Sequence, residues 1–153
     1  MPAYFVDTSA LAKLYHTEIG SQQVEALAAE PDARLIVSQL SLVEIQSVFA
    51  GKVRTGIIDP LTLQQLNGLF FADLAVGRYQ VVLVAGRHFR SAERLIRLHA
   101  VGRALRTLDS LQLAVALDLH QGGFVAKLVA ADKHLCEVAA LEGLGVINPL
   151  HAP

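Results

Sequence analysis

Short apolar runs alternate along the chain with longer segments of helical periodicity, and this alternation restricts the possible folds more than any other feature. The short runs predict strands over residues 3–7, 34–38, 79–84, 126–131 and 146–147. The longer segments predict helices over residues 9–16, 21–30, 41–54, 60–77, 87–100, 108–120 and 133–142. Strands separated by helices form βαβ units, so we expect an α/β fold with a mostly parallel sheet of about five strands and helices on both faces.

Two of the predicted strands are followed by an acidic residue. The runs over 3–7, 79–84 and 126–131 are almost continuously apolar, which is typical of strands buried on both faces. The first run ends at Asp7, and Asp132 follows the run over 126–131. In parallel sheets, ligands bind at the carboxyl ends of the strands, and we therefore expect a site there.

Composition limits the remaining classes of protein. Hydrophobic residues make up 53% of the 153 residues and the formal net charge is −1, so global charge gives no sign of nucleic-acid binding. Cys136 is the only cysteine, which excludes an intrachain disulfide and indicates a reducing compartment. No apolar run is long enough to span a membrane, and no linker divides the chain. We expect one soluble, cytoplasmic domain over residues 1–153.

Four acidic residues stand in apolar surroundings, and each has a structural alternative. Asp7 and Asp132 could cap the helices that follow them. Glu44 lies at the edge of an apolar helix face made by Ile45, Val48 and Phe49, where it could be exposed at its tip. Asp109 points between Leu113 and Ala116 on its predicted helix, but it could be a first-turn acid favoured by the helix dipole, with Thr107 as the cap.

The joint pattern of the four acids is more informative than any one of them. Two follow apolar strands and two lie on or beside apolar helix faces, so a parallel sheet could bring all four to one pocket. Carboxylates crowded together away from water repel one another. A hard divalent cation such as Mg²⁺ or Mn²⁺ relieves that repulsion and suits phosphate chemistry. The pattern therefore predicts a metal site.

With these residues in view, the chain resembles the PIN-domain ribonucleases, specifically the VapC-type toxins of bacterial and archaeal toxin–antitoxin pairs. The resemblance runs over nearly the whole chain and implies a PIN-like three-layer α/β/α sandwich. It is carried by the motifs FVDTSALAKLY, VSQLSLVEIQSVF, LRTLDSLQLAVAL and LVAADKHL, which contain Asp7, Glu44, Asp109 and Asp132 in that order. The order, the spacing and the neighbouring residues agree together.

The resemblance implies a metal-dependent endoribonuclease that hydrolyses RNA phosphodiester bonds. Asp7, Glu44 and Asp109 would be the principal Mg²⁺ or Mn²⁺ ligands, directly or through water, and Asp132 would complete the cluster. Ala130 stands where the family often has threonine or serine, which leaves the role of Asp132 open. Ser9 matches a D-x-S pattern whose hydroxyl supports the first acid, with a helix cap as the alternative. A homodimer and a cognate antitoxin are also implied.

A basic stripe is the other charged feature. Arg87, Arg90, Arg94 and Arg97 fall within an arc of about 80° on one predicted helix face. They could contact RNA phosphates or an acidic antitoxin segment, or they could form a solvated face.

A different class of function also fits acids at strand ends. A receiver-like, phospho-regulated binding module gathers such acids and places a lysine nearby, as Lys133 allows, although two of the acids here come from helices. A PIN scaffold that keeps the metal pocket but acts only through a protein partner is a further alternative. His134 could approach the site or lie on the helix surface, and we expect Cys136 to be a packing residue.

Overall fold

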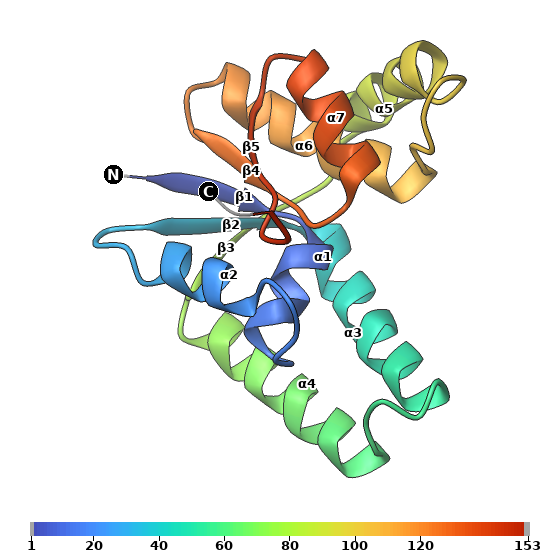
Figure 1. Ribbon diagram of the computed structural model, residues 1–153. Coiled ribbons are helices and arrows are strands. Elements are labelled where there is room, and N and C mark those ends of the chain that lie inside the picture. The colour runs from blue at the N-terminus through green and yellow to red at the C-terminus, as the bar shows by residue number, and fades with distance from the viewer. Residues whose placement is uncertain (1, 152–153) are drawn as a thin grey trace.

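The computed structural model of the protein describes residues 2–151. A parallel five-stranded sheet with the order β3-β2-β1-β4-β5 forms its central layer (Figure 1). The strands are β1 (Ala3–Val6), β2 (Arg34–Ser38), β3 (Tyr79–Val82), β4 (Lys127–Val129) and β5 (Gly145–Ile147).

Helices cover both faces of this sheet (Figure 1). One face carries α1 (Thr8–Leu11), α2 (Ser21–Ala28), α3 (Gln39–Arg54) and α4 (Pro60–Ala75), and the other carries α5 (Gly86–His99), α6 (Thr107–Gln121) and α7 (Lys133–Leu141). The predicted three-layer α/β/α sandwich is therefore confirmed. No helix within residues 2–151 is both long enough and apolar enough to cross a membrane.

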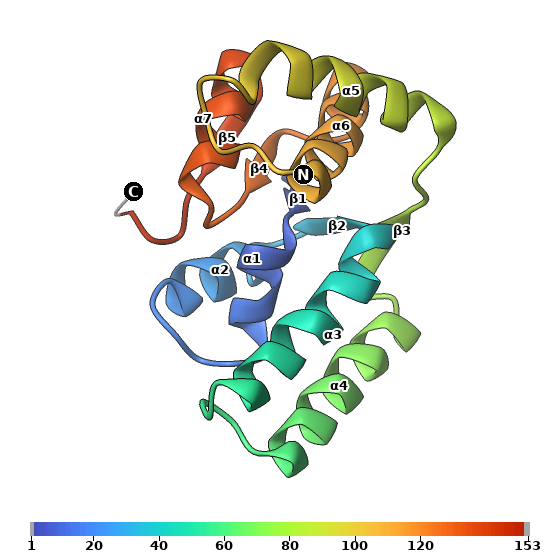
Figure 2. The ribbon, with the colours of Figure 1, turned by 90° about the vertical axis from the view of Figure 1, so that its right-hand side faces the viewer.

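The central strand, β1, separates the two halves of the sheet. Phe5 is in register with Ile36 of β2 on one side and with Leu128 of β4 on the other. After β1 the chain builds outwards to β2 and β3, and then α5 and α6 carry it back to β4 on the opposite side of β1 (Figure 2). The strand order therefore reverses between β1 and β4, and such a switch point opens a crevice at the carboxyl ends of the strands.

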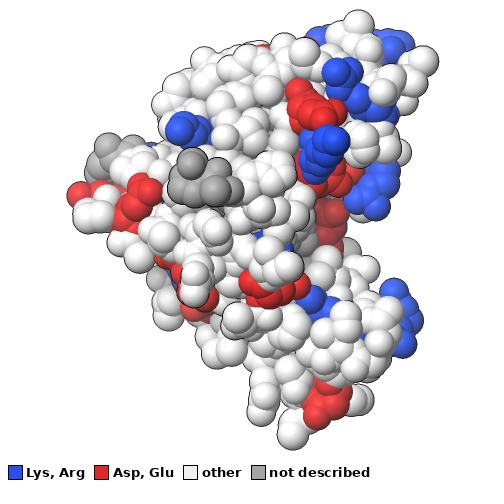
Figure 3. All heavy atoms as spheres, in the orientation of Figure 1, with Lys and Arg blue, Asp and Glu red and all other residues white. Residues whose placement is uncertain are grey.

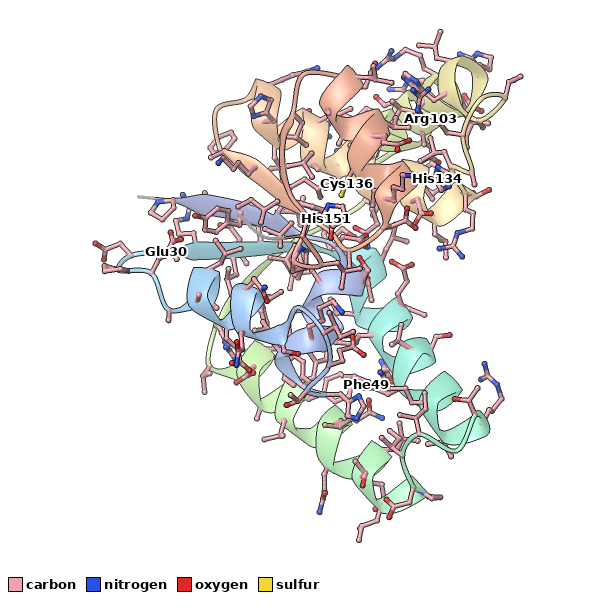
Figure 4. All side chains as sticks on the ribbon, viewed as in Figure 1. Glu30, Phe49, Arg103, His134, Cys136 and His151 are labelled. Atoms are coloured by element: carbon pink, nitrogen blue, oxygen red, sulfur yellow. The ribbon has the colours of Figure 1, made fainter. Side chains whose placement is uncertain are left out.

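Two apolar cores lie on opposite sides of the sheet, as the alternation of side chains along a strand requires. Phe5 of β1 belongs to the core beneath α5, α6 and α7. Its neighbours Tyr4 and Val6 belong to the core of α1, α3 and α4, together with Phe49 and Phe70. Phe49 is fully buried in this second core (Figure 4).

The structure corrects two details of the sequence prediction. The strand expected over 79–84 is not buried on both faces: β3 is an edge strand that ends at Val82, and its Gln80 and Val81 are exposed. The helix expected over 9–16 is α1 followed by a 3₁₀ helix, Ala12–Leu14. The other predicted elements are present with ends shifted by a few residues, as at α3, whose first turn is capped by Ser38.

Candidate active site

All four predicted acids line one cavity of about 340 Å³ at the carboxyl end of the sheet. Ser9 and Arg106 line the same cavity. Acidic side chains lie where the surface is hollowed between the two helical layers, and basic side chains gather above them around α5 (Figure 3). The topology thus brings together residues that are far apart in the sequence.

Asp7 joins the two strands that flank the switch point. Its backbone N–H donates to the carbonyl of Val129 in β4, and its side chain is 5% exposed. Asp7 Oδ2 accepts hydrogen bonds from the backbone N–H of Ser9 at 3.1 Å and from the Ser9 hydroxyl at 2.6 Å. Ser9 Oγ in turn accepts from the backbone N–H of Ala131 at 3.0 Å. Asp7 is the cap of α1, so Ser9 supports the acid and is not itself the cap.

Glu44 is held by a buried polar network that starts at Gln112. Gln112 of α6 is fully buried, and its Nε2 donates to Glu44 Oε1 at 2.7 Å and to Ser41 Oγ at 2.9 Å. Its Oε1 accepts from the Ser38 hydroxyl at 2.7 Å. The Thr8 hydroxyl also donates to Glu44 Oε1, at 3.1 Å. The network fixes one oxygen of Glu44 from two other elements of the fold, α1 through Thr8 and α6 through Gln112.

Asp109 and Asp132 both lie close to the guanidinium group of Arg106. Arg106 Nε donates to Asp109 Oδ2 at 3.2 Å, and Arg106 Nη2 lies 3.8 Å from Asp132 Oδ2. The hydrogen bond to Asp109 raises the pKa of the Arg106 guanidinium. Asp132 caps α7 by accepting from the backbone N–H of Leu135 at 2.9 Å. Asp109 is 8% exposed in the first turn of α6. Arg106, and not Thr107, occupies the N-cap position of this helix, and its side chain makes no capping hydrogen bond.

The electrostatics of the cavity favour a cation. Burial, the largest cause, raises the pKa of Asp7 to about 6, and the charges of Glu44 and Asp109 add to the rise. The two hydrogen bonds from Ser9 oppose it. A carboxylate whose ionised form is penalised in this way gains most from a positive charge placed beside it.

The donor set fits a hydrated divalent cation. Within residues 2–151, no three His, Cys, Asp or Glu side chains converge closely enough to hold one ion directly. Each acid nevertheless has one oxygen held by the protein, while the other accepts no hydrogen bond from the described residues: Asp7 Oδ1, Glu44 Oε2, Asp109 Oδ1 and Asp132 Oδ2. Mg²⁺ binds through one or two carboxylates and keeps several waters, so it does not need a shell of three carboxylates.

Val48 differs from the sequence prediction, whereas His134 and Cys136 take the helix-surface and packing places expected of them. Val48, expected on the apolar face of α3, lines the cavity and is partly exposed. His134 lies on the exposed side of α7, 3.9 Å from Glu137 (Figure 4). Cys136 donates through Sγ to the carbonyl of Ala130, and burial raises its thiol pKa to about 12, as a packing role requires.

Sequence reasoning missed the polar network and the special place of Arg106. Gln112 lies one helical turn after Asp109, which is the only local signal that it shares a face with the acid. Arg106 directly precedes α6 and could have been separated from the other arginines on that ground.

The basic stripe on α5 lies outside the cavity and divides into two pairs. Arg87 forms an ion pair with Asp118 at 3.0 Å, and Arg94 forms one with Glu142. Arg90 and Arg97 are exposed and form no ion pair with any residue in the described range 2–151. Only the charges of this second pair are not balanced by an acid of the described residues.

Comparison with known proteins agrees with this architecture. VapC20 of Mycobacterium tuberculosis, described as a toxin that cleaves the sarcin-ricin loop, is 18% identical, covers 95% of this chain and 99% of its own, and has a TM-score of 0.67. VapBC2 of Rickettsia felis, bound to a promoter DNA fragment, is 15% identical, with 95% of this chain and 98% of its own covered and a TM-score of 0.63. A chain of a toxin–antitoxin complex of Klebsiella pneumoniae is 19% identical, with 97% of this chain and 99% of its own covered and a TM-score of 0.61. At these identities the likeness shows a shared fold.

The family assignment comes from the sequence itself. No curated protein matches the chain. The family model described as PIN domain matches residues 4–141, which include all four acids of the cavity. This assignment favours the PIN interpretation over the receiver-like one. Because the match covers most of its length, the chain belongs to the PIN domain family.

Proposed function

We propose that the protein is a metal-dependent endoribonuclease and the toxin of a VapBC-type toxin–antitoxin pair. The observation that carries the proposal is the set of four carboxylates in one cavity, each with one oxygen fixed and the other left without a hydrogen bond among residues 2–151. Membership of the PIN domain family supports it, as does the resemblance in fold to toxins such as VapC20.

In this proposal Asp7, Glu44 and Asp109 hold Mg²⁺ or Mn²⁺, directly or through water, and Asp132 completes the acidic cluster. When bound, the ion supplies an activated water and positive charge for the oxygens of an in-line phosphodiester displacement. Ser9 keeps Asp7 in place, and Gln112 does the same for Glu44. Arg106, with a side chain 77% exposed at the mouth of the cavity, can turn from Asp109 to donate to a phosphate oxygen of the incoming RNA.

The proposed partners are an antitoxin and a second copy of the chain. Two of the similar structures are complexes of a toxin with its antitoxin, which supports an antitoxin partner here. The homodimer is proposed from the family resemblance. The chain has apolar surface for such contacts, since Ile57, Leu61, Leu69 and Val76 are all more than half exposed along α4 and its flanks.

The test is cleavage of total cellular RNA by purified, antitoxin-free protein, with Mg²⁺, with Mn²⁺ and with a chelator. We expect cleavage with either ion and none with the chelator. Asp109→Asn, purified in the same way, controls for contaminating nuclease, and equal activity in both samples would contradict the role of Asp109. A folded, metal-loaded sample that cleaves no RNA would favour a PIN scaffold acting only through a protein partner.

The two pairs of arginines on α5 should contribute differently to RNA binding. Neutralised phosphates release counterions, so each lost contact to a single strand lowers the slope of log affinity against log salt by about 0.7. Arg90→Ala/Arg97→Ala should therefore flatten the slope by about one unit or more in a filter-binding titration. Arg87→Ala/Arg94→Ala, which removes arginines already paired with acids, should change it less. Slopes unchanged from wild type in both variants would assign the stripe to solvent.

A further inference from the structure

A second cavity lies on the other side of the first turn of α6. It has a volume of about 320 Å³ and is enclosed by one stripe of α5 and by Thr107, Ser110 and Leu111 of α6. Phe89, Glu93 and Arg97 of α5 line it with the smaller apolar side chains between them. Thr107 and Ser110 belong, like Asp109, to the first turn of α6, so this α5/α6 groove and the acidic cavity use the same helical turn.

We propose that the α5/α6 groove binds an unpaired nucleobase of the RNA strand whose phosphate enters the acidic cavity. The inference rests on the proposed nuclease function and adds a substrate subsite to it. It restricts the substrate to RNA in which at least one base beside the cleaved bond is unstacked.

The chemistry of the lining favours a base over other apolar ligands. Phe89 is 54% exposed, so its ring is available for a stacking partner, whereas Ala92 and Leu111 form the buried floor. Bases of single-stranded RNA stack on aromatic rings and on arginine guanidinium planes, and Arg97 supplies such a plane at the same rim. The carboxylate of Glu93 is an acceptor for the N–H groups that base edges carry.

Charge and continuity identify the strand that would deliver the base. Arg90 and Arg97 lie on the same helix as Phe89 and form no ion pair within residues 2–151. Arg106 lines the acidic cavity and directly precedes Thr107 of the groove. Arginines at the groove and at the acidic cavity offer phosphate contacts near both sites. Basic side chains gather around α5, with acidic side chains among them (Figure 3). The groove volume is at the lower end of the range of roughly 300–1,000 Å³ for small-ligand sites, which suits one base.

The experiment measures binding and cleavage separately. A fluorescein-labelled single-stranded RNA of mixed sequence is titrated with wild type, Phe89→Ala, Phe89→Tyr and Leu98→Ala in chelator, and anisotropy gives Kd. Leu98 is the matched control, because it is 60% exposed on α5 but does not line the groove. Phe89→Ala should weaken binding by about 5- to 100-fold, the range for one lost stack, and Phe89→Tyr should restore it.

Two further readouts separate stacking from a general structural effect. The salt slope of Phe89→Ala should equal that of wild type, because no charge is lost. An abasic strand should bind wild type and Phe89→Ala equally. With Mg²⁺ present, KM for cleavage should rise by a similar factor while kcat changes little.

The possible failures are distinguishable. Metal-dependent cleavage by wild type, with the same Kd and KM for Phe89→Ala and Leu98→Ala, would overturn the base subsite and leave the nuclease function standing. Loss of RNA affinity in Phe89→Ala without any cleavage by wild type would support the subsite and contradict the nuclease function. Unchanged RNA affinity with a lower mass in light scattering would overturn the proposal and make the groove a protein contact.

Discussion

Asp7→Asn is expected to stabilise the metal-free protein and at the same time to reduce metal-dependent RNA cleavage by at least about 10³-fold. The asparagine keeps an oxygen that accepts from Ser9, so the local hydrogen bonds survive. It removes a buried charge whose pKa burial raises from 3.8 to about 6. Cleavage is lost because charge stabilisation by a bound divalent ion contributes several kcal/mol to the transition state.

The gain in stability from Asp7→Asn should depend on pH. The folded protein binds the Asp7 proton more tightly than the unfolded chain does, so the free energy of unfolding of wild type falls as the pH rises from 3.8 to about 6, and it stays lowered above that. Asp7→Asn has no carboxyl group at this position, so its free energy of unfolding does not fall for this reason as the pH rises. Urea unfolding in chelator should show little difference at about pH 4 and a gain of about 1–3 kcal/mol at about pH 7.

Asp118→Asn is the matched comparison, because its effect on stability at neutral pH should be opposite to that of Asp7→Asn. The hydrogen bond from His88, followed by that from Arg87, lowers the pKa of Asp118, so this carboxylate stabilises the fold above its unfolded pKa and loses that effect as the pH falls through its folded pKa. Asp118→Asn should therefore destabilise the protein at neutral pH. A loss of stability at neutral pH in Asp7→Asn would show that its charge is compensated in the folded protein.

Gln112→Leu should destabilise the protein by about 2–4 kcal/mol. The leucine has nearly the shape of glutamine, but it leaves the buried hydroxyl of Ser38 without its acceptor and Glu44 without its shortest hydrogen bond. Each buried group that loses its partner costs about 1–3 kcal/mol. Because Glu44 is then less well oriented, Mg²⁺ affinity measured by calorimetry should fall by about 10- to 100-fold.

Gln121→Leu provides the control for that variant. Gln121 lies on the same helix but is exposed, so the same chemical change should alter stability by no more than about 0.5 kcal/mol. Equal stability for Gln112→Leu and wild type would mean that the polar network is not needed to hold Glu44.

The acids of the cavity could be predicted because their signals are local. Asp7 and Asp132 each follow an apolar strand, and a parallel sheet places the ends of such strands at one edge. Asp109 lies in the first turn of a helix whose middle, from Leu113 to Leu117, is entirely apolar, which indicates burial. The helix-cap alternatives were not in conflict with this prediction, since Asp7 and Asp132 cap helices and line the cavity at once.

Features that depend on distant partners could not be predicted in this way. Arg87 and Arg94 look like Arg90 and Arg97 in the sequence, yet their partners Asp118 and Glu142 are 31 and 48 residues away. The Glu44–Gln112 contact spans 68 residues. The prediction that β3 is buried on both faces was wrong for a similar reason. An apolar run does not reveal whether a strand will lie at the centre or at the edge of the sheet.

The strand order also determines when the acidic cavity can form during synthesis of the chain. Asp7 and Glu44 leave the ribosome early, but the cavity is closed by Asp109 and Asp132, and β1 lacks its second neighbour until β4 has emerged. Gln112, which orients Glu44, also belongs to the later part of the chain. A nascent chain therefore carries its first two acids without an assembled site. The site can assemble only after the chain as far as Asp132 has emerged.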